Sequence, residues 1–489
     1  MTIVRTVCDR DKKSVAGKPI LLCMRDSAGE GTGDSMNDQH GTNETAAFLG
    51  KATDLSAGSD GCLKPSFSEA ARVWARIGCL GFGGPAGQIA LMHREVVETR
   101  RWVPEDRFLH ALNYCMLLPG PEAQQLAIYI GWLLHGTRGG LVAGIFFVLP
   151  GLCILLGLST LYALYHQTGM LSAVFFGLKA AVLAIVVEAL LRLARRALKT
   201  VSSRIIAALA FAALFFFSVP FPLVILVAGL FGLLAAGRSA DAGLMPETTR
   251  SRTWPQTLAL IGLWSCLWIA PLGLVVVLWG TQSVFFALHV FFSKMAVVTF
   301  GGAYAVLAYV AQQAVETHHW LRPGEMLDGL ALAETTPGPL VLVLTFVAFM
   351  AAFRVPPPGL DPVVAGLVGG LVATWVTFVP CFALIFLGAP SVERLRGNRM
   401  AVAAMNAISA AVVGVILNLA VWFALHVLFA SVQQSRLGPL VVCYPELASF
   451  DVSAALLALL AGSLLFVARL GVVGTLAVCA AGGLVLSML

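Results

Sequence analysis

The amino-acid sequence predicts an all-α polytopic membrane protein made of two inverted-topology repeats with broken helices and about 10–13 transmembrane segments. Three observations support this fold class. Of the 489 residues, 58% are hydrophobic and 12% are charged, whereas a soluble domain carries about 25% charged residues. Apolar segments near the ~20 residues that cross a bilayer follow one another along the chain. The Gly and Pro residues that interrupt these segments occur in a pattern that repeats once.

The first element is polar. Residues 1–65 are rich in Gly, Ser, Asp and Lys and hold no apolar run long enough for a signal-peptide core. A segment of this composition cannot bury enough surface to fold. We therefore expect a disordered cytoplasmic tail.

The rest of the chain is duplicated. Phe82-Gly83-Gly84 and Pro119-Gly120-Pro121 recur 218 residues later as Phe300-Gly301-Gly302 and Pro337-Gly338-Pro339. From Phe82 to Pro121, marks included, roughly a third of the positions are identical to those from Phe300 to Pro339, against roughly a twentieth by chance. The duplication divides the chain into a first repeat (66–240), a linker with one transmembrane helix (241–282) and a second repeat (283–489).

Each repeat contains the same series of apolar segments. Each series has four long segments and then a short pair, which in the first repeat lies around Pro220 and Pro222. The predicted segments are 68–90, 108–135, 138–162, 170–191, 204–219 and 221–237, then 254–280 in the linker, then 284–302, 327–353, 362–388, 400–429, 453–467 and 471–488.

Basic residues predict the orientation, because Arg and Lys are enriched in cytoplasmic loops. One group follows the fourth segment of the first repeat, and the other precedes the fourth segment of the second. Both groups are cytoplasmic only if the second repeat is inverted. The loop 93–107 fits this topology poorly because it would face outside with four arginines, so either the first Phe-Gly-Gly segment is re-entrant or the segment count is wrong by one. The two groups are Arg192, Arg195, Arg196, Lys199 and Arg204, and Arg394, Arg396 and Arg399.

The Gly and Pro breaks are candidate substrate-binding positions. Both residue types interrupt helices, and backbone groups freed at membrane depth are tolerated only in a protein interior or a wet cavity. Pro121 and Pro339 suit the first turn of a new helix, where free amides and the helix dipole favour an anion. A simple kink is the alternative. The candidates are Phe82, Gly83, Gly84, Pro85, Gly120, Pro121, Phe300, Gly301, Gly302, Gly338 and Pro339.

Two cations add to this hypothesis. Arg76 and Lys294 each lie six residues before a Phe-Gly-Gly, inside an apolar segment, where a charge costs about 2.5–3.5 kcal/mol on the insertion scale. Together they could neutralise a divalent anion between the repeats. The alternatives are snorkelling to the interface and a structural ion pair.

Three acids are candidates for proton coupling, namely Glu122, Glu334 and Glu188. Glu122 directly follows the first Pro-Gly-Pro, and Glu334 precedes the second by three positions. A carboxyl group next to an anion site must be protonated for the anion to bind well, which would couple its protonation state to anion binding and release. The alternative for Glu122 is a favourable charge–dipole contact at a helix start.

Other classes of function lack support. The ten cysteines are scattered without a CxxC pair, which argues against a zinc site or a disulfide framework. There is no Walker loop or nucleophile elbow, so we expect no enzyme, cofactor or metal. The basic residues flank apolar segments, which is a topology signal and not a nucleic-acid surface.

These motifs resemble the chromate ion transporter (CHR) family in its long two-domain form. The resemblance rests on Phe82-Gly83-Gly84-Pro85, Leu118-Pro119-Gly120-Pro121 and their second copies, and covers roughly residues 66–489. It implies a multi-pass protein of the bacterial inner membrane that exports chromate, plausibly by proton antiport, and confers resistance. Arg76 stands where the family often has lysine, which keeps the charge but changes the donor geometry.

Two alternatives stay open at this point. Sulfate and other tetrahedral oxyanions share the charge and shape of chromate, so the substrate preference does not follow from the resemblance. A membrane sensor that transports nothing is the alternative from another class, although no cytoplasmic output domain is recognisable in the sequence. The predicted partners are chromate, protons and the lipid bilayer, and a homodimer is compatible with the sequence.

Overall fold

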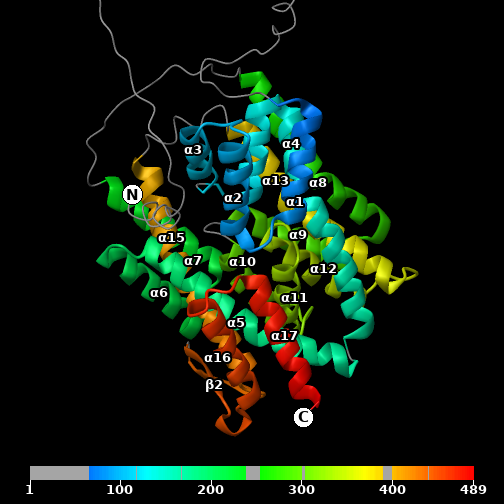
Figure 1. Ribbon diagram of the computed structural model, residues 1–489, viewed down its shortest axis with the longest axis vertical. Helices are drawn as coiled ribbons and strands as arrows, with labels where there is room; N and C mark the ends of the chain where they lie inside the picture. Colours follow the sequence, from blue (N-terminus) through cyan, green and yellow to red (C-terminus); the bar gives the residue numbers. More distant parts are fainter. Residues whose placement is uncertain are drawn as a thin grey trace, which may run out of the picture. The chain divides into compact units, whose positions relative to one another are not determined.

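The computed structural model describes residues 65–488 except 117, 167, 238–253, 300–302, 389–398 and 439. The predicted tail, the start of the linker, the second Phe-Gly-Gly and two of the basic residues, Arg394 and Arg396, therefore lie outside the described residues. The described chain is almost entirely helical (Figure 1). Five of its helices are long and apolar enough to cross a membrane. These findings confirm the predicted all-α polytopic class.

The helices of the first repeat follow the predicted segments. They are α1 (Phe67–Leu80), α2 (Gly84–His93), the π-helix η1 (Arg94–Thr99), α3 (Glu105–Cys115), α4 (Glu122–Tyr165), α5 (Gly169–Ala197), α6 (Val201–Phe217) and α7 (Phe221–Gly237). The linker helix α8 (Trp254–Trp279) comes next.

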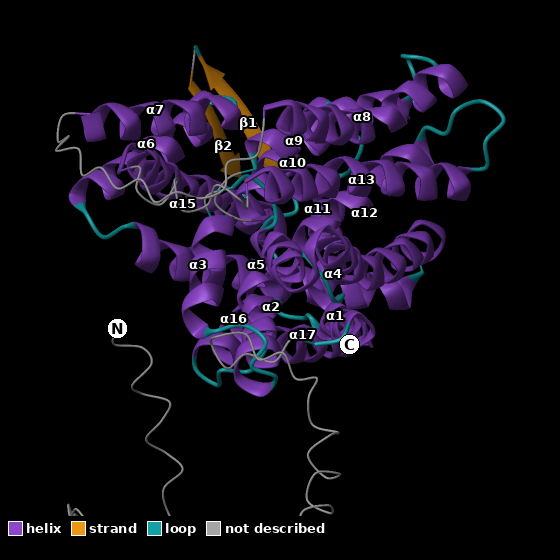
Figure 2. Cartoon of the chain, turned by 90° about the horizontal axis from the view of Figure 1, so that it is seen from above, coloured by secondary structure: helices purple, strands orange, loops and turns teal. Residues whose placement is uncertain are grey.

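The second repeat has the same series. It comprises α9 (Val284–Val298), α10 (Ala303–Gln312), the π-helix η2 (Gln313–Thr317), α11 (Pro323–Thr335), the 3₁₀ helix η3 (Leu340–Leu342), α12 (Val343–Arg354), α13 (Pro362–Gly388), α15 (Arg399–Leu428), α16 (Val452–Phe466) and α17 (Val472–Met488). Between α15 and α16 lie the strands β1 (Val432–Leu437) and β2 (Leu440–Pro445) and the 3₁₀ helix η5 (Leu447–Ser449). The strands form an antiparallel hairpin with Gln433 opposite Tyr444 (Figure 2).

The long helix α4 folds back on itself at His135 and Gly136, whose backbone angles are not helical. A Cβ on Gly131 would lie 2.5 Å from the carbonyl oxygen of Gly139. Residues eight positions apart in a straight helix are about 12 Å apart, so this contact requires a reversal of the chain. The reversal separates the predicted segments 108–135 and 138–162. In the second repeat, a loop between α12 and α13 joins the equivalent helices.

The two repeats share local features that sequence identity alone does not require. The π-helices η1 and η2 occupy equivalent positions. After them, the amides of Trp102 and Trp320 donate to the carbonyl oxygens of Val96 and Ala314 over 2.8 and 2.7 Å. Arg101 and His319, also equivalent, have φ of 52° and 51°. The duplication seen in the sequence is therefore present in the backbone.

The repeats pack by exchanging their last helices. Helix α5 of the first repeat packs against α16 and α17 of the second, and α15 of the second packs against α6 and α7 of the first (Figure 1). The buried core also spans both repeats. One apolar cluster joins α1, α3 and the first part of α4 to Cys381 and Phe382 of α13, and a larger cluster joins α5 to the second repeat. Close packing of small residues supports such contacts between helices in lipid.

Candidate functional site

Two hydrogen bonds connect the breaks of one repeat to those of the other. The amide of Gly120 donates to the carbonyl oxygen of Thr299 over 2.8 Å, and the amide of Gly338 donates to that of Gly81 over 3.0 Å. Gly120 corresponds to Gly338, and Gly81 to Thr299, at the repeat spacing of 218. The bonds are therefore equivalent by the repeat. Each joins a Pro-Gly-Pro to the residue before the Phe-Gly-Gly of the other repeat.

Helices α4 and α13, each with an internal proline, show the same relation between the repeats. A Cβ on Gly151, which follows Pro150 in α4, would lie 2.1 Å from the carbonyl oxygen of Pro337. Its counterpart Cys381 follows Pro380 in α13, and a Cβ on Gly120 would lie 2.8 Å from the Cys381 sulfur. Helices α4 and α13 therefore each pack against the Pro-Gly-Pro of the other repeat. Both Pro-Gly-Pro glycines are buried.

The first Phe-Gly-Gly is more accessible. Gly83 and Gly84 have φ of 84° and 68°, a region that side chains with a Cβ rarely adopt. A Cβ on either glycine would meet no atom within 4 Å, and Phe82 is 37% exposed. Helix α2 begins here, with Pro85 in its first turn. The backbone at this helix start therefore borders open space. The second Phe-Gly-Gly lies outside the described residues.

Each Pro-Gly-Pro precedes a new helix. Pro121 is the N-terminal flanking residue of α4, and Pro339 that of η3, which continues into α12. The first amides of a helix have no partner within it. Helices α1, α3, α9, α11 and α12 each have 15 residues or fewer and reach at most about 22 Å. Each alone is too short to cross the apolar core of a bilayer, which is about 30 Å thick.

Three buried glutamines, which no sequence motif indicated, lie around these breaks. The Nε2 of Gln88 donates to the carbonyl oxygens of both Gly81 and Gly338 and so bridges the two repeats. Gln125 donates to the carbonyl oxygen of Pro119 over 2.6 Å. Gln124 is 0% exposed, and neither polar atom of its side-chain amide has a partner. The Oε1 atoms of Gln88 and Gln125 are likewise unpartnered.

The acids predicted for proton coupling lie near arginines of α5. The Tyr304 hydroxyl donates to Glu334 over 2.6 Å, and Glu188 forms an ion pair with Arg192 one turn later. Glu334 interacts electrostatically with Glu188 and Arg192, and Glu122 with Arg196. Arg192 and Arg196 are one helical turn apart. In the sequence these arginines indicated only the topology, whereas in the structure they interact with the carboxylates.

Arg76 and Lys294 occupy equivalent places on α1 and α9. Both side chains are exposed on the surface of the chain. Lys294 interacts electrostatically with His318 in the loop after η2. Within the part of the chain that the structure describes, no ion pair is formed by either cation.

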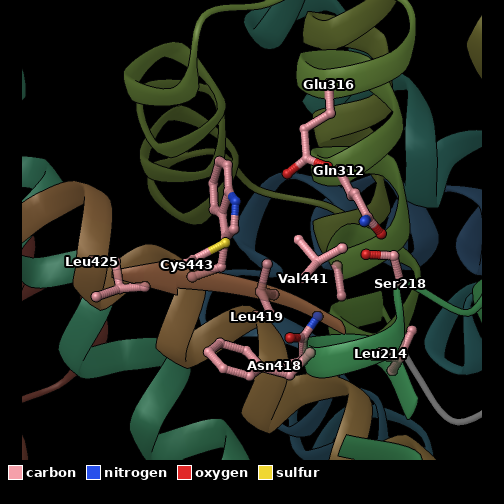
Figure 3. Close-up of a pocket in the computed structure, with 12 residues that line it drawn as sticks. Leu214, Ser218, Gln312, Glu316, Asn418, Leu419, Leu425, Val441 and Cys443 are labelled. Atoms are coloured by element: carbon pink, nitrogen blue, oxygen red, sulfur yellow. The ribbon is translucent and has the colours of Figure 1, made fainter. Parts of the chain in front are cut away.

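A cavity of about 160 Å³ lies apart from the breaks (Figure 3). It is bounded by α6, α10, η2, α15 and β2, and no residue of the four breaks lines it. Ser218, Gln312 and Asn418 contribute polar groups, and Glu316 contributes a carboxylate. A carboxylate repels a dianion, so this cavity is unsuited to an anionic substrate. No cluster of three potential metal ligands occurs among the described residues.

Comparison with known proteins places these features in a family. The model of the chromate transporter family matches residues 68–233 and 286–486. The chain is a member of the chromate transporter family. Each matched region contains one Phe-Gly-Gly and one Pro-Gly-Pro, so the breaks that meet in the structure lie within the parts that define membership. No solved structure matches the chain.

Several curated relatives resemble this family member along most of their length. A chromate transport protein of Pseudomonas aeruginosa is 33% identical over 76% of this chain and 85% of its own. One from Cupriavidus metallidurans is 30% identical over 70% of this chain and 78% of its own. A probable chromate transport protein of Synechococcus elongatus is 29% identical over 72% and 83%. Family membership and the apolar helices indicate a multi-pass membrane protein.

Proposed function

We propose that this protein is a secondary transporter that exports chromate across the bacterial inner membrane in exchange for protons and thereby gives chromate resistance. Its family and the names of its relatives support the substrate. Transport of this kind needs a site that both sides of the membrane reach in turn, and secondary transporters build it from broken helices at the interface of their repeats.

The pair of equivalent hydrogen bonds between the repeats carries the proposal. Gly120 with Thr299, and Gly338 with Gly81, bring the Pro-Gly-Pro of each repeat to the helix break of the other. Equivalent bonds in both directions are typical of a two-fold relation. We propose that this pseudo-two-fold axis lies in the membrane plane, which makes the repeats inverted. The substrate site then lies on the axis.

Chromate is a tetrahedral dianion, so the site must supply hydrogen-bond donors and positive charge. We assign substrate binding to the backbone at Phe82, Gly83, Gly84 and Pro85, at Gly120 and Pro121, at Phe300, Gly301 and Gly302, and at Gly338 and Pro339. The prolines have no amide hydrogen, and the amides of Phe82, Gly120 and Gly338 already donate within the protein. The proposed donors are therefore the free amides at the helix starts that these residues form. Arg76 and Lys294 are the proposed cations, and Arg192 and Arg196 of α5 extend the positive charge toward Glu122 and Glu334. Charge-assisted hydrogen bonds of this kind are about twice as strong as neutral ones.

Proton exchange requires a carboxyl group whose ionised form has a charge of the same sign as the anion. Glu334 is 3% exposed and accepts a hydrogen bond from Tyr304, and Glu122 starts α4 beside the buried Pro121. An ionised carboxylate near chromate raises the electrostatic energy, so the protonation state of the carboxyl group changes the affinity of the site for the anion. Glu188, paired with Arg192, is the third acid in this proposal.

The proposed arrangement in the membrane follows from the loop charges. The tail 1–65 and the α5 end around Arg195 and Lys199 face the cytoplasm. Residues 66–240 and 283–489 form the two transporting repeats, and 241–282 link them with one crossing that allows the inversion. A homodimer is compatible with this arrangement.

Everted membrane vesicles test the substrate and the direction together. Their cytoplasmic face is outside, so export appears as chromate accumulation when the vesicle interior is acidified. We expect accumulation that excess sulfate does not reduce and that a protonophore abolishes. Absence of chromate accumulation would refute the proposal. Inhibition by sulfate would instead indicate a transporter of tetrahedral oxyanions in general.

The proposed cation pair leads to a mutational prediction. Lys294→Met should abolish chromate accumulation, because an exposed methionine fits at this position of α9 while the positive charge is lost. The amount of protein in the membrane fraction should not change. Arg72→Met on α1 is the matched control, since Arg72 is exposed and bonds only within its own helix turn. Normal transport by Lys294→Met would remove Lys294 from the site.

A further inference from the structure

A second polar cluster lies inside the protein, away from the acids considered so far. Asp328 of α11 is 3% exposed. Its Oδ2 accepts a hydrogen bond from the Tyr162 hydroxyl over 2.7 Å and lies 3.3 Å from the Lys179 Nζ. Its Oδ1 has no partner. Asp328 is therefore a buried acid with one oxygen bonded twice and the other available.

The cluster connects the two repeats. Tyr162 of α4 and Lys179 of α5 belong to the first repeat, whereas Asp328 belongs to the second. At the repeat spacings, Asp328 corresponds to His110 and Lys179 to Ser409, so the pair exists on one side of the pseudo-symmetric interface only. A buried ion pair is a poor source of stability compared with apolar packing. The presence of this ion pair across the interface therefore suggests a role other than stabilising the fold.

Few charged groups surround Asp328, so the gain of a single proton would change the net charge of this cluster. Glu325, one turn before it, is neutralised by an ion pair with Arg354 of α12. His166 stacks on Tyr162. The other elements that pack on α11 add little charge. Helices η3 and α17 contain no Asp, Glu, Lys, Arg or His, and α15 carries Arg399 and His426 only near its ends. Lys179 is thus the cation that faces Asp328 directly.

The cluster also has a route to the surface. The Lys179 side chain is 30% exposed, whereas that of Asp328 is 5% exposed. The ammonium group of Lys179 therefore lies between Asp328 and the surface of the chain. Ionisable residues that face one another inside a membrane protein are typical of proton pathways.

We propose that Asp328 is a coupling protonation site and that its ion pair with Lys179 is a latch between the two repeats. This inference rests on the proposed proton-coupled transport. With Asp328 ionised, Lys179 and Tyr162 hold α5 and α4 against α11. When a proton binds to the carboxylate it forms one O–H bond and cancels the charge, so Lys179 is released. The repeats can then rearrange around the breaks.

Reconstituted protein tests the latch through two fluxes. Proteoliposomes with an internal pH dye report proton movement driven by chromate, and radiolabelled chromate reports exchange of chromate for chromate, which needs no net proton transfer. In Asp328→Asn, which mimics the protonated acid, we expect exchange to persist and chromate-driven proton movement to be lost. Asp361→Asn is the matched control, because Asp361 is an exposed acid that caps α13, a position that asparagine also fills. Proton movement like that of the unmodified protein in Asp328→Asn would overturn the inference.

Infrared spectroscopy tests the protonation without transport. The difference between spectra at low and high pH should contain a carboxylic-acid band that Asp328→Asn removes and Asp361→Asn retains. Tyr162→Phe deletes only the hydroxyl that bonds to the carboxylate, so it should shift the same band. A band that neither variant changes would overturn the inference. Failure of the unmodified protein to move chromate would instead count against the proposed function, and the infrared result would still decide the role of Asp328.

Discussion

Single residues around the breaks differ between the repeats in a systematic way. Gln88 and Gln124 of the first repeat stand where the second has Val306 and Leu342. Buried amide atoms without partners cost about 1–3 kcal/mol each, which a purely structural site would avoid. These polar side chains are therefore concentrated in one repeat, and we propose that a polar substrate offsets that cost.

Gln124→Leu tests this asymmetry. Leucine fits the equivalent position in the second repeat, so we expect an unchanged or higher melting temperature. Chromate accumulation should fall roughly tenfold or more, because a hydrogen bond to a charged group contributes about 1.5–3 kcal/mol. Thermal unfolding in detergent and vesicle transport measure the two effects. Gln433→Leu on the exposed face of β1 serves as a control. Full transport by Gln124→Leu would show that the amide does not serve the substrate.

The glutamines also show what the sequence could reveal at this scale. Charged residues in apolar segments, such as Lys294, stand out because they are costly in lipid. A neutral amide such as Gln124 does not, because its significance depends on whether its partners are missing, which only the folded contacts reveal. The electrostatic interaction between Arg196 and Glu122 was hidden for a related reason. Arginines near the end of an apolar segment already had an explanation as topology signals.

At the scale of elements, the glycine after Pro150 sets how closely α4 approaches the second Pro-Gly-Pro. Gly151 faces the backbone carbonyl of Pro337, which belongs to a buried break and cannot move aside as a flexible side chain would. Gly157 lies on the same helix, and a Cβ there would meet no atom within 4 Å. Alanine substitutions at these two glycines therefore distinguish the effect of the close contact with Pro337 from the general effect of alanine in a helix.

Gly151→Ala should push α4 away from Pro337. We expect a loss of stability of about 1–3 kcal/mol, which is typical of overpacking, together with reduced transport. Gly157→Ala should keep or slightly raise the melting temperature, because alanine is the better helix former. Thermal unfolding of both purified variants checks this. Equal stability of the two variants would contradict the close contact at Gly151.

The helices could be predicted from the sequence wherever a long apolar segment was enough to specify a helix. The segments 170–191 and 362–388 became α5 and α13 nearly unchanged, because a long apolar run in lipid has few alternatives to a helix. The reversal inside α4 was predicted only as a gap between two segments. The hairpin of β1 and β2 was missed, since its pairing follows from cross-strand contacts and not from apolar length.

At the scale of the whole molecule, the two repeats form one interlocked unit. Each gives its last two helices to the other, so α5 is covered by α16 and α17 while α15 is covered by α6 and α7. The sequence predicted that the repeats exist, because identical residues recur at one spacing. It did not predict the exchange, because no residue pattern in the sequence indicates which repeat supplies the helix pair that packs against α5 or α15.

Separating the repeats tests the interlocking. A chain cut within 238–253 and expressed as two polypeptides should give halves that purify together and move chromate. Either half expressed alone should fail to accumulate, since its fourth helix would lack its cover. Affinity purification through a tag on one half measures the association. Stable accumulation of a lone half would contradict the interlocked arrangement.

The equivalent bonds from Gly120 to Thr299 and from Gly338 to Gly81 are those of an isologous dimer interface. Two identical short chains could make them without a linker. In a symmetric pair of chains, however, each substitution appears twice, so an acid placed opposite a lysine would be duplicated on the other side. Covalent fusion removes that constraint and lets one copy change alone. An ancestral homodimer of identical subunits could not have evolved such differences between its two halves. Examples are Gln124, whose equivalent is Leu342, and the pairing of Asp328 with Lys179 on one side only.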